Sequence, residues 1–333
     1  MISRREFVRD LAVAGAAGAL GMSHNVLAAE PPPETTRIRV VRDPSICLAP
    51  LYVAEELLGH EGFREISYVA LDGKLSNAGM LGAGKADFGM DAAPTLIMSL
   101  DAGESIVVLA GVHVGCYELF ATPRIRAVRE LKGATIAIAQ ERDDRHAFVA
   151  SMLTQVGLNP RTDVKWVTHP AETAIQLLAD GRIDALLGFP PEPQELRAKK
   201  IGHLLLSTLT DRPWSQYLCC LAIASREYAR RYPVATKRAL RAILKANAIC
   251  AAEPERVSRL MVEKGHVAKS PYAHQALQEI PYARWREFDA ADTLRFYALR
   301  LREGGMIRNS PDKILTQGTD WRFLNELKKE LKT

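Results

Sequence analysis

Two similar stretches of this chain decide how it folds. Residues 84–94 read GKADFGMDAAP, and residues 181–191 read GRIDALLGFPP. In both copies a glycine follows an apolar helical pattern, a basic residue and an aspartate come soon after, and an apolar segment ends at proline. The glycine suits a helix C-terminus, and the apolar segment is typical of a buried strand. Each copy therefore predicts a helix, a tight turn, a strand, and a loop at the carboxyl end of that strand.

The surrounding sequence alternates short apolar strands with helical patterns as far as residue 224. Such alternation is typical of an α/β fold with a mostly parallel sheet and helices on both of its faces. Ligands of open α/β sheets bind outside the carboxyl ends of the strands, so two copies predict two sheets facing one cleft. From Ser225 onward the pattern is helical, with Pro233 separating two helices. Strands are expected at residues 38–41, 66–71, 106–110, 117–122, 135–139, 163–167, 201–206 and 218–224, with residues 111–116 as a loop.

Residues 1–28 resemble a twin-arginine export signal. The stretch SRREF at residues 3–7 precedes an Ala- and Gly-rich apolar run from Leu11 to Met22, and Ala28 ends a cleavage-site pattern. This run is too short to span a bilayer, and no later segment has the roughly 18 to 20 apolar residues that a span requires. We expect a mature periplasmic protein that starts near Ala29 and is exported by the twin-arginine route.

Composition and charge narrow the class of protein. The chain has 333 residues, of which 47% are hydrophobic and 25% charged, enough for two domains of moderate size. Its net charge of +5 falls by one unit when residues 1–28 are removed. This mild charge argues against a nucleic-acid partner, which requires a concentrated basic stripe.

The cysteines are interpreted mainly as small buried apolar residues. Their number is odd, so at least one thiol is free, and a disulfide between two of the others is left open. No CxxC pair and no zinc-type Cys/His spacing is present, so we expect no metal and no cofactor. The five are Cys47, Cys116, Cys219, Cys220 and Cys250.

Six short segments, taken in order, resemble one family. None is specific by itself, but together they make nearly the whole mature chain similar to the periplasmic solute-binding proteins of ABC transporters, in the nitrate/sulfonate/taurine and thiamine-precursor group. The segments are LAPLYVA at 48–54, GKADFG at 84–89 with Pro94, LKG at 131–133, VGL at 156–158, GRIDA at 181–185, and Tyr232-Pro233 before a long helix.

The resemblance implies the type II periplasmic-binding-protein fold, in which two α/β lobes are joined by two crossing segments. We place the crossings near residues 119–123 and 218–222. Lobe one is then 36–121 plus 222–333, and lobe two is 122–221. The resemblance also implies a monomer that binds a small organic solute between its lobes, closes on it, and delivers it to a membrane permease and, through the permease, to an ATPase.

The loops at the carboxyl ends of the strands supply the candidate ligand contacts. In lobe one these are Ser45, Cys47, Leu48, Asp72, Gly73, Asp91, Ala92, Ala93, Gly115 and Cys116. In lobe two they are Gln140, Arg142, His146, Phe189, Pro191, Glu192, Trp214 and Tyr217. Small residues let backbone amides approach a ligand, and the aromatic residues would form apolar walls.

Several candidates have an equally simple structural interpretation. Trp214 and Tyr217 could be ordinary packing residues, His146 could be a helix-terminal residue, and Arg142 could be solvated. Asp87 and Asp184, in the two repeated stretches, are expected to bond backbone amides and serve as scaffold.

The loop after the strand at 135–139 suggests the charge of the ligand. It carries Glu141, Asp143 and Asp144, and one of these two aspartates is expected to cap the following helix. A carboxylate there occupies the place where a simple anion would bind. With Asp91 and Glu192 on other loops, the sequence favours a neutral, zwitterionic or amine-bearing organic solute over nitrate or sulfate.

Two other functions remain open. Enzymes that make the thiamine pyrimidine share the family's fold, but their resemblance includes a cysteine-rich iron-binding run that the pair Cys219-Cys220 does not match. No nucleophile-elbow, zinc-protease or phosphate-loop motif is present, so we expect a protein that is not an enzyme. The remaining alternative is a periplasmic sensor subunit that presents its ligand to a signalling receptor.

Overall fold

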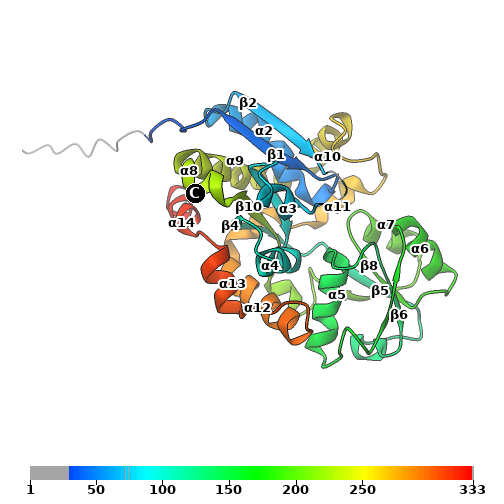
Figure 1. Cartoon of the computed structure of the whole chain (residues 1–333). Coiled ribbons are helices and arrows are strands. Elements are labelled where there is room, and N and C mark those ends of the chain that lie inside the picture. The colour runs from blue at the N-terminus through cyan, green and yellow to red at the C-terminus, as the bar shows by residue number, and fades with distance from the viewer. Residues whose placement is uncertain (1–29, 72, 74, 332–333) are drawn as a thin grey trace, which may run out of the picture. The chain divides into compact units, whose positions relative to one another are not determined.

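The computed structural model of this chain describes residues 30–71, 73 and 75–331. The expected signal, residues 1–28, and the candidate Asp72 lie outside the described residues. Two five-stranded sheets organise the described part, and helices cover them (Figure 1). The predicted α/β class is confirmed.

The first sheet has the order β2-β1-β3-β10-β4. Strands β1, β2 and β3 run parallel, while β10 runs antiparallel to both of its neighbours, β3 and β4. The strands are β1 (Arg37–Arg42), β2 (Glu65–Ala70), β3 (Phe88–Ala92), β4 (Ile106–Val114) and β10 (Leu218–Ser225).

The second sheet repeats this pattern with the order β7-β6-β8-β5-β9. Here β5 is the antiparallel strand. In each sheet the antiparallel strand is the one that enters directly from the other sheet along the chain, so the sheets are mostly parallel, as predicted. The strands are β5 (Glu118–Ala121), β6 (Thr135–Ile138), β7 (Lys165–Thr168), β8 (Ala185–Gly188) and β9 (His203–Ser207).

Capping residues and prolines mark the starts of several helices. Asp143 and Asp289 cap α5 and α12, and Pro233 begins the longest helix, α9. Figure 1 shows α5 on one side of the second sheet and α6 and α7 on the other. The helices are α2 (Ala49–His60), α3 (Asn77–Gly82), α4 (Ala93–Asp101), α5 (Asp144–Gln155), α6 (Ala171–Ala179), α7 (Glu192–Lys199), α8 (Arg226–Arg231), α9 (Pro233–Ala252), α10 (Pro254–Glu263), α11 (Ala273–Glu279), α12 (Ala290–Glu303), α13 (Pro311–Gly318) and α14 (Arg322–Glu330). Short 3-10 helices lie at Ile46–Leu48, Val128–Leu131, Trp214–Gln216 and Tyr282–Glu287.

Two connections link the sheets. The first runs from β4 to β5 through residues 115–117, and the second from β9 to β10 through residues 208–217. Strand β4 extends to Val114, because its pairing with β10 continues into the segment that was expected to be a loop. Strand β5 pairs only within the second sheet and β10 only within the first. The two connections therefore end before these strands, slightly earlier in the chain than the expected crossings at 119–123 and 218–222. The division into two moving lobes stays a prediction.

The two repeated stretches form β3 and β8 with the turns before them, and their aspartates have the same role. Asp87 Oδ2 accepts a hydrogen bond from the backbone N–H of Arg39 in β1 at 2.8 Å. Asp184 Oδ2 accepts one from the backbone N–H of Thr135 in β6, also at 2.8 Å. Each carboxylate therefore ties its strand to the neighbouring strand, which agrees with the scaffold role expected for both residues.

Two hydrophobic cores support this arrangement. The larger one joins the first sheet and its helices to α5 and continues to Leu187 in β8. The smaller one fills the space between the second sheet and α6 and α7, with Phe120 and Leu178 among its members. Among the described helices, none combines the length and apolarity needed to cross a bilayer.

We predict that Asp87→Ala lowers the free energy of unfolding by about 1–3 kcal/mol, because it leaves the Arg39 N–H and guanidinium without their acceptor. The Asp87 carboxylate is 9% exposed and also pairs with Arg39 Nη2 at 2.7 Å. Glu65→Ala is the matched control, since the Arg37–Glu65 pair is 67% and 63% exposed and should contribute less than about 1 kcal/mol. Equal losses for the two variants in urea unfolding would contradict the scaffold role.

Candidate functional site

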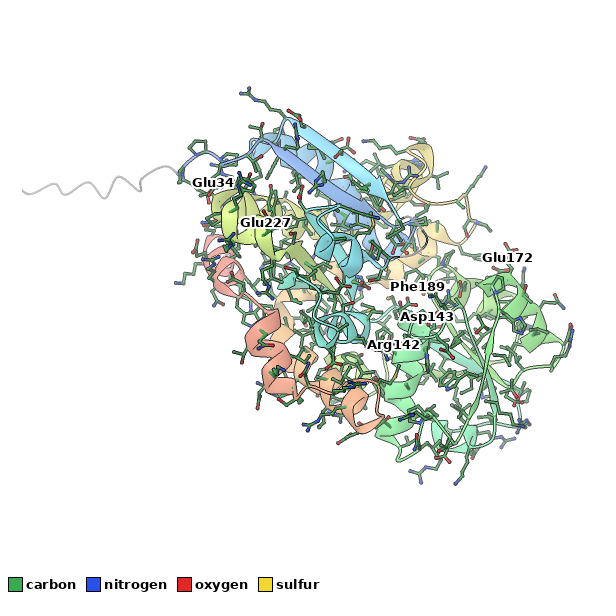
Figure 2. The ribbon with its side chains drawn as sticks, in the orientation of Figure 1. Glu34, Arg142, Asp143, Glu172, Phe189 and Glu227 are labelled. Carbon is green, nitrogen blue, oxygen red and sulfur yellow. The ribbon has the colours of Figure 1, made fainter. Side chains whose placement is uncertain are left out.

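A pocket of about 280 Å³ opens between the two sheets, at the carboxyl ends of β1, β3 and β6. Figure 2 shows Arg142 and Asp143 at the start of α5, on the side toward α4. Helix α5 packs against α4 there. From the first sheet the pocket is lined by Asp43, Leu71, Gly73, Leu75, Ser76, Asn77, Asp91 and Thr95, and from the second by Gln140, Glu141, Arg142, Asp143 and Asp144.

Asp91 is the most unusual group in this pocket. Its Oδ1 accepts a hydrogen bond from the backbone N–H of Ala92 at 2.8 Å. Its Oδ2 is buried, and no donor among the described residues reaches it. Burial and, to a smaller extent, the nearby Asp43 and Asp144 carboxylates raise the pKa of Asp91 to about 8, although the hydrogen bond from Ala92 N–H lowers it. Below about pH 8 the Asp91 carboxyl is therefore mainly protonated.

Asp43 and Asn77 form the wall beside Asp91. Asn77 Nδ2 donates to Asp43 Oδ2 at 2.8 Å, and the Ser45 hydroxyl donates to Asp43 Oδ1. The donation to Asp43 fixes the orientation of the Asn77 amide, which leaves its Oδ1 as a buried acceptor without a donor among the described residues. Burial raises the pKa of Asp43 as well. This wall thus presents acceptors and lacks donors.

The N-terminus of α5 is already occupied by a carboxylate of the chain. Asp143 accepts hydrogen bonds from the backbone N–H groups of His146 at 2.8 Å, Gln140 at 2.9 Å and Ala139 at 3.1 Å. The prediction that an aspartate caps this helix is confirmed. The backbone amides that would hold a simple anion at a helix N-terminus are taken by Asp143.

The charge of Glu192 is balanced by an ion pair with Arg145 at the start of α5. Its carboxylate receives two hydrogen bonds from Arg145, at 2.6 and 2.8 Å, and one from the backbone N–H of Phe189 at 3.1 Å. The two side chains of the ion pair are 15% and 16% exposed. Because such a bidentate pair satisfies both charges, Glu192 is not available as a free counter-ion.

The aromatic candidates pack on neighbouring side chains and do not line the pocket. Tyr217 stacks on Phe296 of α12 with ring centroids 3.8 Å apart, and Trp214 lies edge-on to the same ring at 5.4 Å. Phe189 packs against Tyr117 at 5.2 Å. His146 contacts Trp166 at 4.4 Å and accepts a hydrogen bond from the backbone N–H of Arg142. Burial lowers the pKa of His146.

The remaining sequence candidates fall into three groups. Gly73, Asp91, Gln140 and Arg142 line the pocket. Ser45, Ala92 and Ala93 lie within two residues of lining residues in the chain, and Ser45 reaches the pocket through Asp43. Leu48 is a core residue and Pro191 precedes α7, so neither lines the pocket. Gly115, Cys116 and Cys47 lie elsewhere, Gly115 against Leu209 and the two cysteines in a cluster of thiols. Sequence reasoning missed Asp43, Asn77 and Thr95, although Asp43 directly follows β1.

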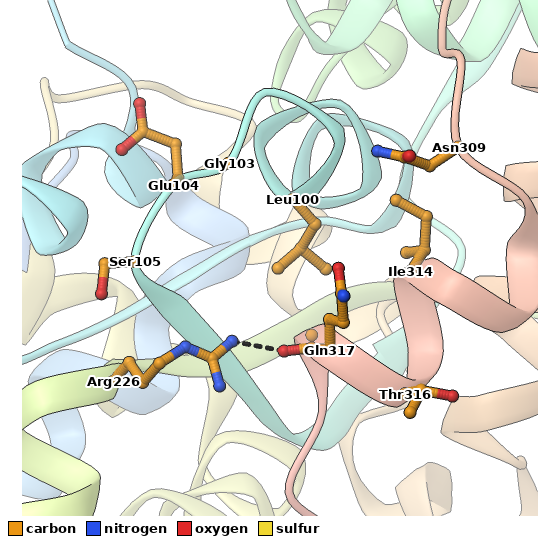
Figure 3. Close-up of a pocket in the computed structure, with 10 residues that line it drawn as sticks. Leu100, Gly103, Glu104, Ser105, Arg226, Asn309, Ile314, Thr316 and Gln317 are labelled. Carbon is orange, nitrogen blue, oxygen red and sulfur yellow. Dashed lines mark hydrogen bonds between the residues drawn. The ribbon is translucent and has the colours of Figure 1, made fainter.

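A larger pocket, about 440 Å³, lies elsewhere, at the end of α4 and along α13 (Figure 3). Arg226 donates there to the backbone oxygens of Ile106, at 2.7 Å, and of Gln317. Its guanidinium is therefore engaged in hydrogen bonds to backbone carbonyl groups that stabilise the fold. None of the buried, unpaired side-chain atoms found in the described residues belongs to this pocket. The smaller pocket between the sheets is the better candidate site.

The fold and the position of this pocket define a class: the protein has the periplasmic-binding-protein fold. A family model described as NMT1/THI5 like matches residues 48–257. The chain therefore belongs to the NMT1/THI5-like family, and the predicted family is confirmed. A search of curated proteins finds no significant match.

Solved structures similar to this chain are mostly binding proteins. The periplasmic nitrate-binding protein NrtA from Synechocystis PCC 6803 is 14% identical, with a TM-score of 0.73, and the match covers 91% of this chain and 90% of that one. The periplasmic aliphatic sulphonate-binding protein SsuA from Escherichia coli is 19% identical, with a TM-score of 0.66, covering 85% and 91%. The desulfurization enzyme DSZB is 17% identical, with a TM-score of 0.57, covering 88% and 99%.

The raised pKa of Asp91 predicts a pH-dependent stability difference between the wild type and Asp91→Asn. The folded protein holds a proton on Asp91 up to about pH 8, whereas the unfolded chain releases it near the ordinary aspartate pKa of 3.8. Wild-type stability therefore falls across this window as pH rises, by up to about 1.4 kcal/mol per pH unit from this group. The asparagine variant lacks this loss. Urea unfolding at several pH values should show that the free energy of unfolding of Asp91→Asn increases relative to that of the wild type as pH rises. A difference between the two proteins that does not change with pH would contradict the prediction.

Proposed function

We propose that this protein is the solute-binding component of an ABC importer and that its solute is a small organic molecule bearing a protonated amine. The observation that carries the proposal is the set of buried acceptors in the pocket between the sheets. Asp91 Oδ2 and Asn77 Oδ1 have no donor among the described residues, and Asp43 and Asp144 lie close enough to raise the pKa of Asp91. Asn77 Oδ1 is a buried acceptor, and Asp91 Oδ2 becomes one when its carboxyl is ionised. Buried acceptors without partners are costly, so the ligand would supply the missing donors.

Charge supports an ammonium group over a neutral donor. A cation beside Asp91 favours the ionised carboxylate, so its arrival lowers the raised pKa and releases the proton. The pair then gains a charge-assisted hydrogen bond in a poorly hydrated pocket. A pocket of about 280 Å³ suits a small solute.

The same geometry argues against the anions bound by the named relatives. NrtA is a nitrate-binding protein, and SsuA binds aliphatic sulphonates. In this chain Asp143 takes the amides at the start of α5, and Asp43, Asp91 and Asp144 add further carboxylates. A nitrate or sulfonate group would meet repulsion from these carboxylates, and the Arg142 guanidinium that lines the pocket already donates to the backbone oxygen of Met306 at 3.2 Å.

The cellular setting is part of the same proposal. A twin-arginine signal would export the folded protein to the periplasm, where a monomer would bind its solute, close its two lobes and meet a permease and its ATPase. The likeness to periplasmic binding proteins supports this setting. Genes for a permease and an ATPase next to this one would favour import over the alternative of a sensor subunit.

Isothermal titration calorimetry tests the ligand class after a thermal-shift screen of small organic amines. An amine that raises the melting temperature should bind the wild type more than tenfold more tightly than Asp91→Asn, because the variant removes its counter-ion. Glu65→Gln removes an exposed carboxylate away from the pocket and should leave affinity unchanged. Tight binding of nitrate or taurine, with no amine binding, would overturn the proposed ligand class.

Proton release gives a second, independent measurement. At pH 7, binding of the amine to the wild type should release a proton from Asp91, seen as a dependence of the binding enthalpy on the ionisation enthalpy of the buffer. Affinity should rise with pH toward about 8, where Asp91 ionises without help. In Asp91→Asn both effects should disappear, and an unchanged pH dependence would show that another group binds the amine.

An enzymatic function is the second candidate, because one similar structure is a desulfurization enzyme. The described cysteines are all buried, and none of them lines the pocket between the sheets. We therefore favour binding without turnover. Incubation of the purified protein with each solute found in the screen, followed by mass spectrometry of the solute, separates the two: an unchanged solute supports the carrier.

A further inference from the structure

Three cysteine sulfurs and one histidine nitrogen lie close together at the place where both connections between the sheets meet the first sheet. Cys116 lies in the connection from β4 to β5, and Cys219 and Cys220 stand at the start of β10, just after the other connection. The three sulfurs and a ring nitrogen of His113 all lie within 4.8 Å of one another, and all four residues are buried. None of the four residues lines the carboxylate-lined pocket described above, although Cys220 is paired with Ala92, the residue next to Asp91.

The backbone explains how these residues come together. His113 in β4 is paired with Cys220 in β10, so their side chains share one face of the sheet. Cys219 is the extra residue of a β-bulge between Leu218 and Cys220, and the bulge re-aims its side chain. As a result the sulfurs of Cys219 and Cys220 are only 3.8 Å apart although the residues are consecutive. The Cys116 sulfur is 3.0 Å from that of Cys219.

His113 provides a second, independent observation. Its side chain is 0% exposed, and its Nδ1 lies 3.3 Å from the backbone oxygen of Val114. A carbonyl only accepts, so Nδ1 carries the proton and Nε2 keeps its lone pair. Within the part of the chain that the structure describes, Nε2 has no hydrogen-bond partner. A buried, unpaired nitrogen held in this tautomer has the arrangement of a metal-binding histidine, whose other ring nitrogen donates to a backbone carbonyl.

We propose that His113, Cys116, Cys219 and Cys220 form a closed binding site for Zn²⁺. In a tetrahedral site with Zn–S bonds of about 2.3 Å, neighbouring sulfurs lie about 3.8 Å apart. Cys219 and Cys220 already have this separation. The Cys116 sulfur has to move away from Cys219 by less than about 1 Å to match it. Three thiolates and one imidazole are a ligand set typical of structural zinc.

A fourth cysteine stands next to the ligand set. Cys47, on the 3-10 helix Ile46–Leu48, has its sulfur 4.0 Å from that of Cys220. Its thiol can donate to the Cys220 thiolate and so help to hold that ligand in place, as outer hydrogen bonds do at metal sites. Cys116 also lines a small cavity of about 20 Å³ with Glu118 and Glu279.

A disulfide between Cys116 and Cys219 is the competing interpretation of this cluster. It would use two of the donors and leave His113 Nε2 without a partner among the described residues. Zinc uses all four. Because its ligands come from both connections, a bound ion would join the two segments that link the sheets, and binding to the folded state alone would raise the melting temperature.

The first experiment uses the full-length mature protein, purified under reducing conditions and stripped of metal by chelator. Titration with Zn²⁺ against a chromophoric competitor should show one tightly bound ion per chain, and the melting temperature should rise. Titration with Co²⁺ should give the charge-transfer and visible bands of a tetrahedral thiolate site. Failure of the reduced protein to bind Zn²⁺ would overturn the proposal.

Variants test the ligands. Cys219→Ser and Cys220→Ser should each weaken Zn²⁺ binding by at least about 100-fold, since even the loss of an outer partner costs 10- to 100-fold. Cys250→Ser is the matched control, because Cys250 is equally buried, on α9, but lies outside the cluster. It should bind Zn²⁺ as the wild type does. Wild-type affinity for Zn²⁺ in both cluster variants would overturn the assignment. If a variant folds poorly, the Co²⁺ spectrum of the wild type still shows whether a tetrahedral thiolate site forms.

Thiol counting distinguishes zinc from the disulfide. Protein isolated without reductant but with Zn²⁺ should retain all five thiols after denaturation in chelator. Loss of a pair of thiols, with the cross-link mapped to Cys116 and Cys219, would overturn the zinc site. Neither result depends on solute binding, so the proposed import function is tested separately.

Discussion

The bond between an aspartate carboxylate and the backbone of the neighbouring strand is the constraint on which both sheets depend. Asp87 holds β3 to β1, and Asp184 holds β8 to β6. In each sheet this strand lies between the parallel strands and the strand that enters from the other sheet. A hydrogen bond from a backbone N–H to a carboxylate is strong only where water is excluded and the two groups are well aligned. Such a bond therefore fixes the register of the strands that it joins.

That register places the functional groups. Four residues beyond Asp87, β3 carries Asp91 to the carboxyl end of the sheet, where Asp43 and the loop before α5 meet it. Burial among carboxylates then makes Asp91 an acid that is protonated near neutral pH. The polar chemistry of the pocket follows from this environment, because the same side chain in water would be ionised and hydrated.

Much of this architecture was predictable. Hydrophobic periodicity, glycines after helices and prolines after strands located the elements, and the repeated stretches indicated two equivalent sheets. The cap by Asp143 was also predictable, since it depends on residues that are adjacent in sequence. The site was predictable only in part. Asp91, Gln140 and Arg142 line the pocket, whereas Glu192 is paired with Arg145 and Tyr217 is stacked on Phe296.

What the sequence by itself determined are the local features: strands, helices, caps, the scaffold aspartates and the family. Only the tertiary structure decided which polar groups remain without partners. The pairing of Glu192 with Arg145, the orphan oxygens of Asp91 and Asn77, and the assembly of His113 with three cysteines all join residues that are distant in sequence. Hydrogen-bond satisfaction and burial depend on neighbours in space, and a linear pattern does not contain them.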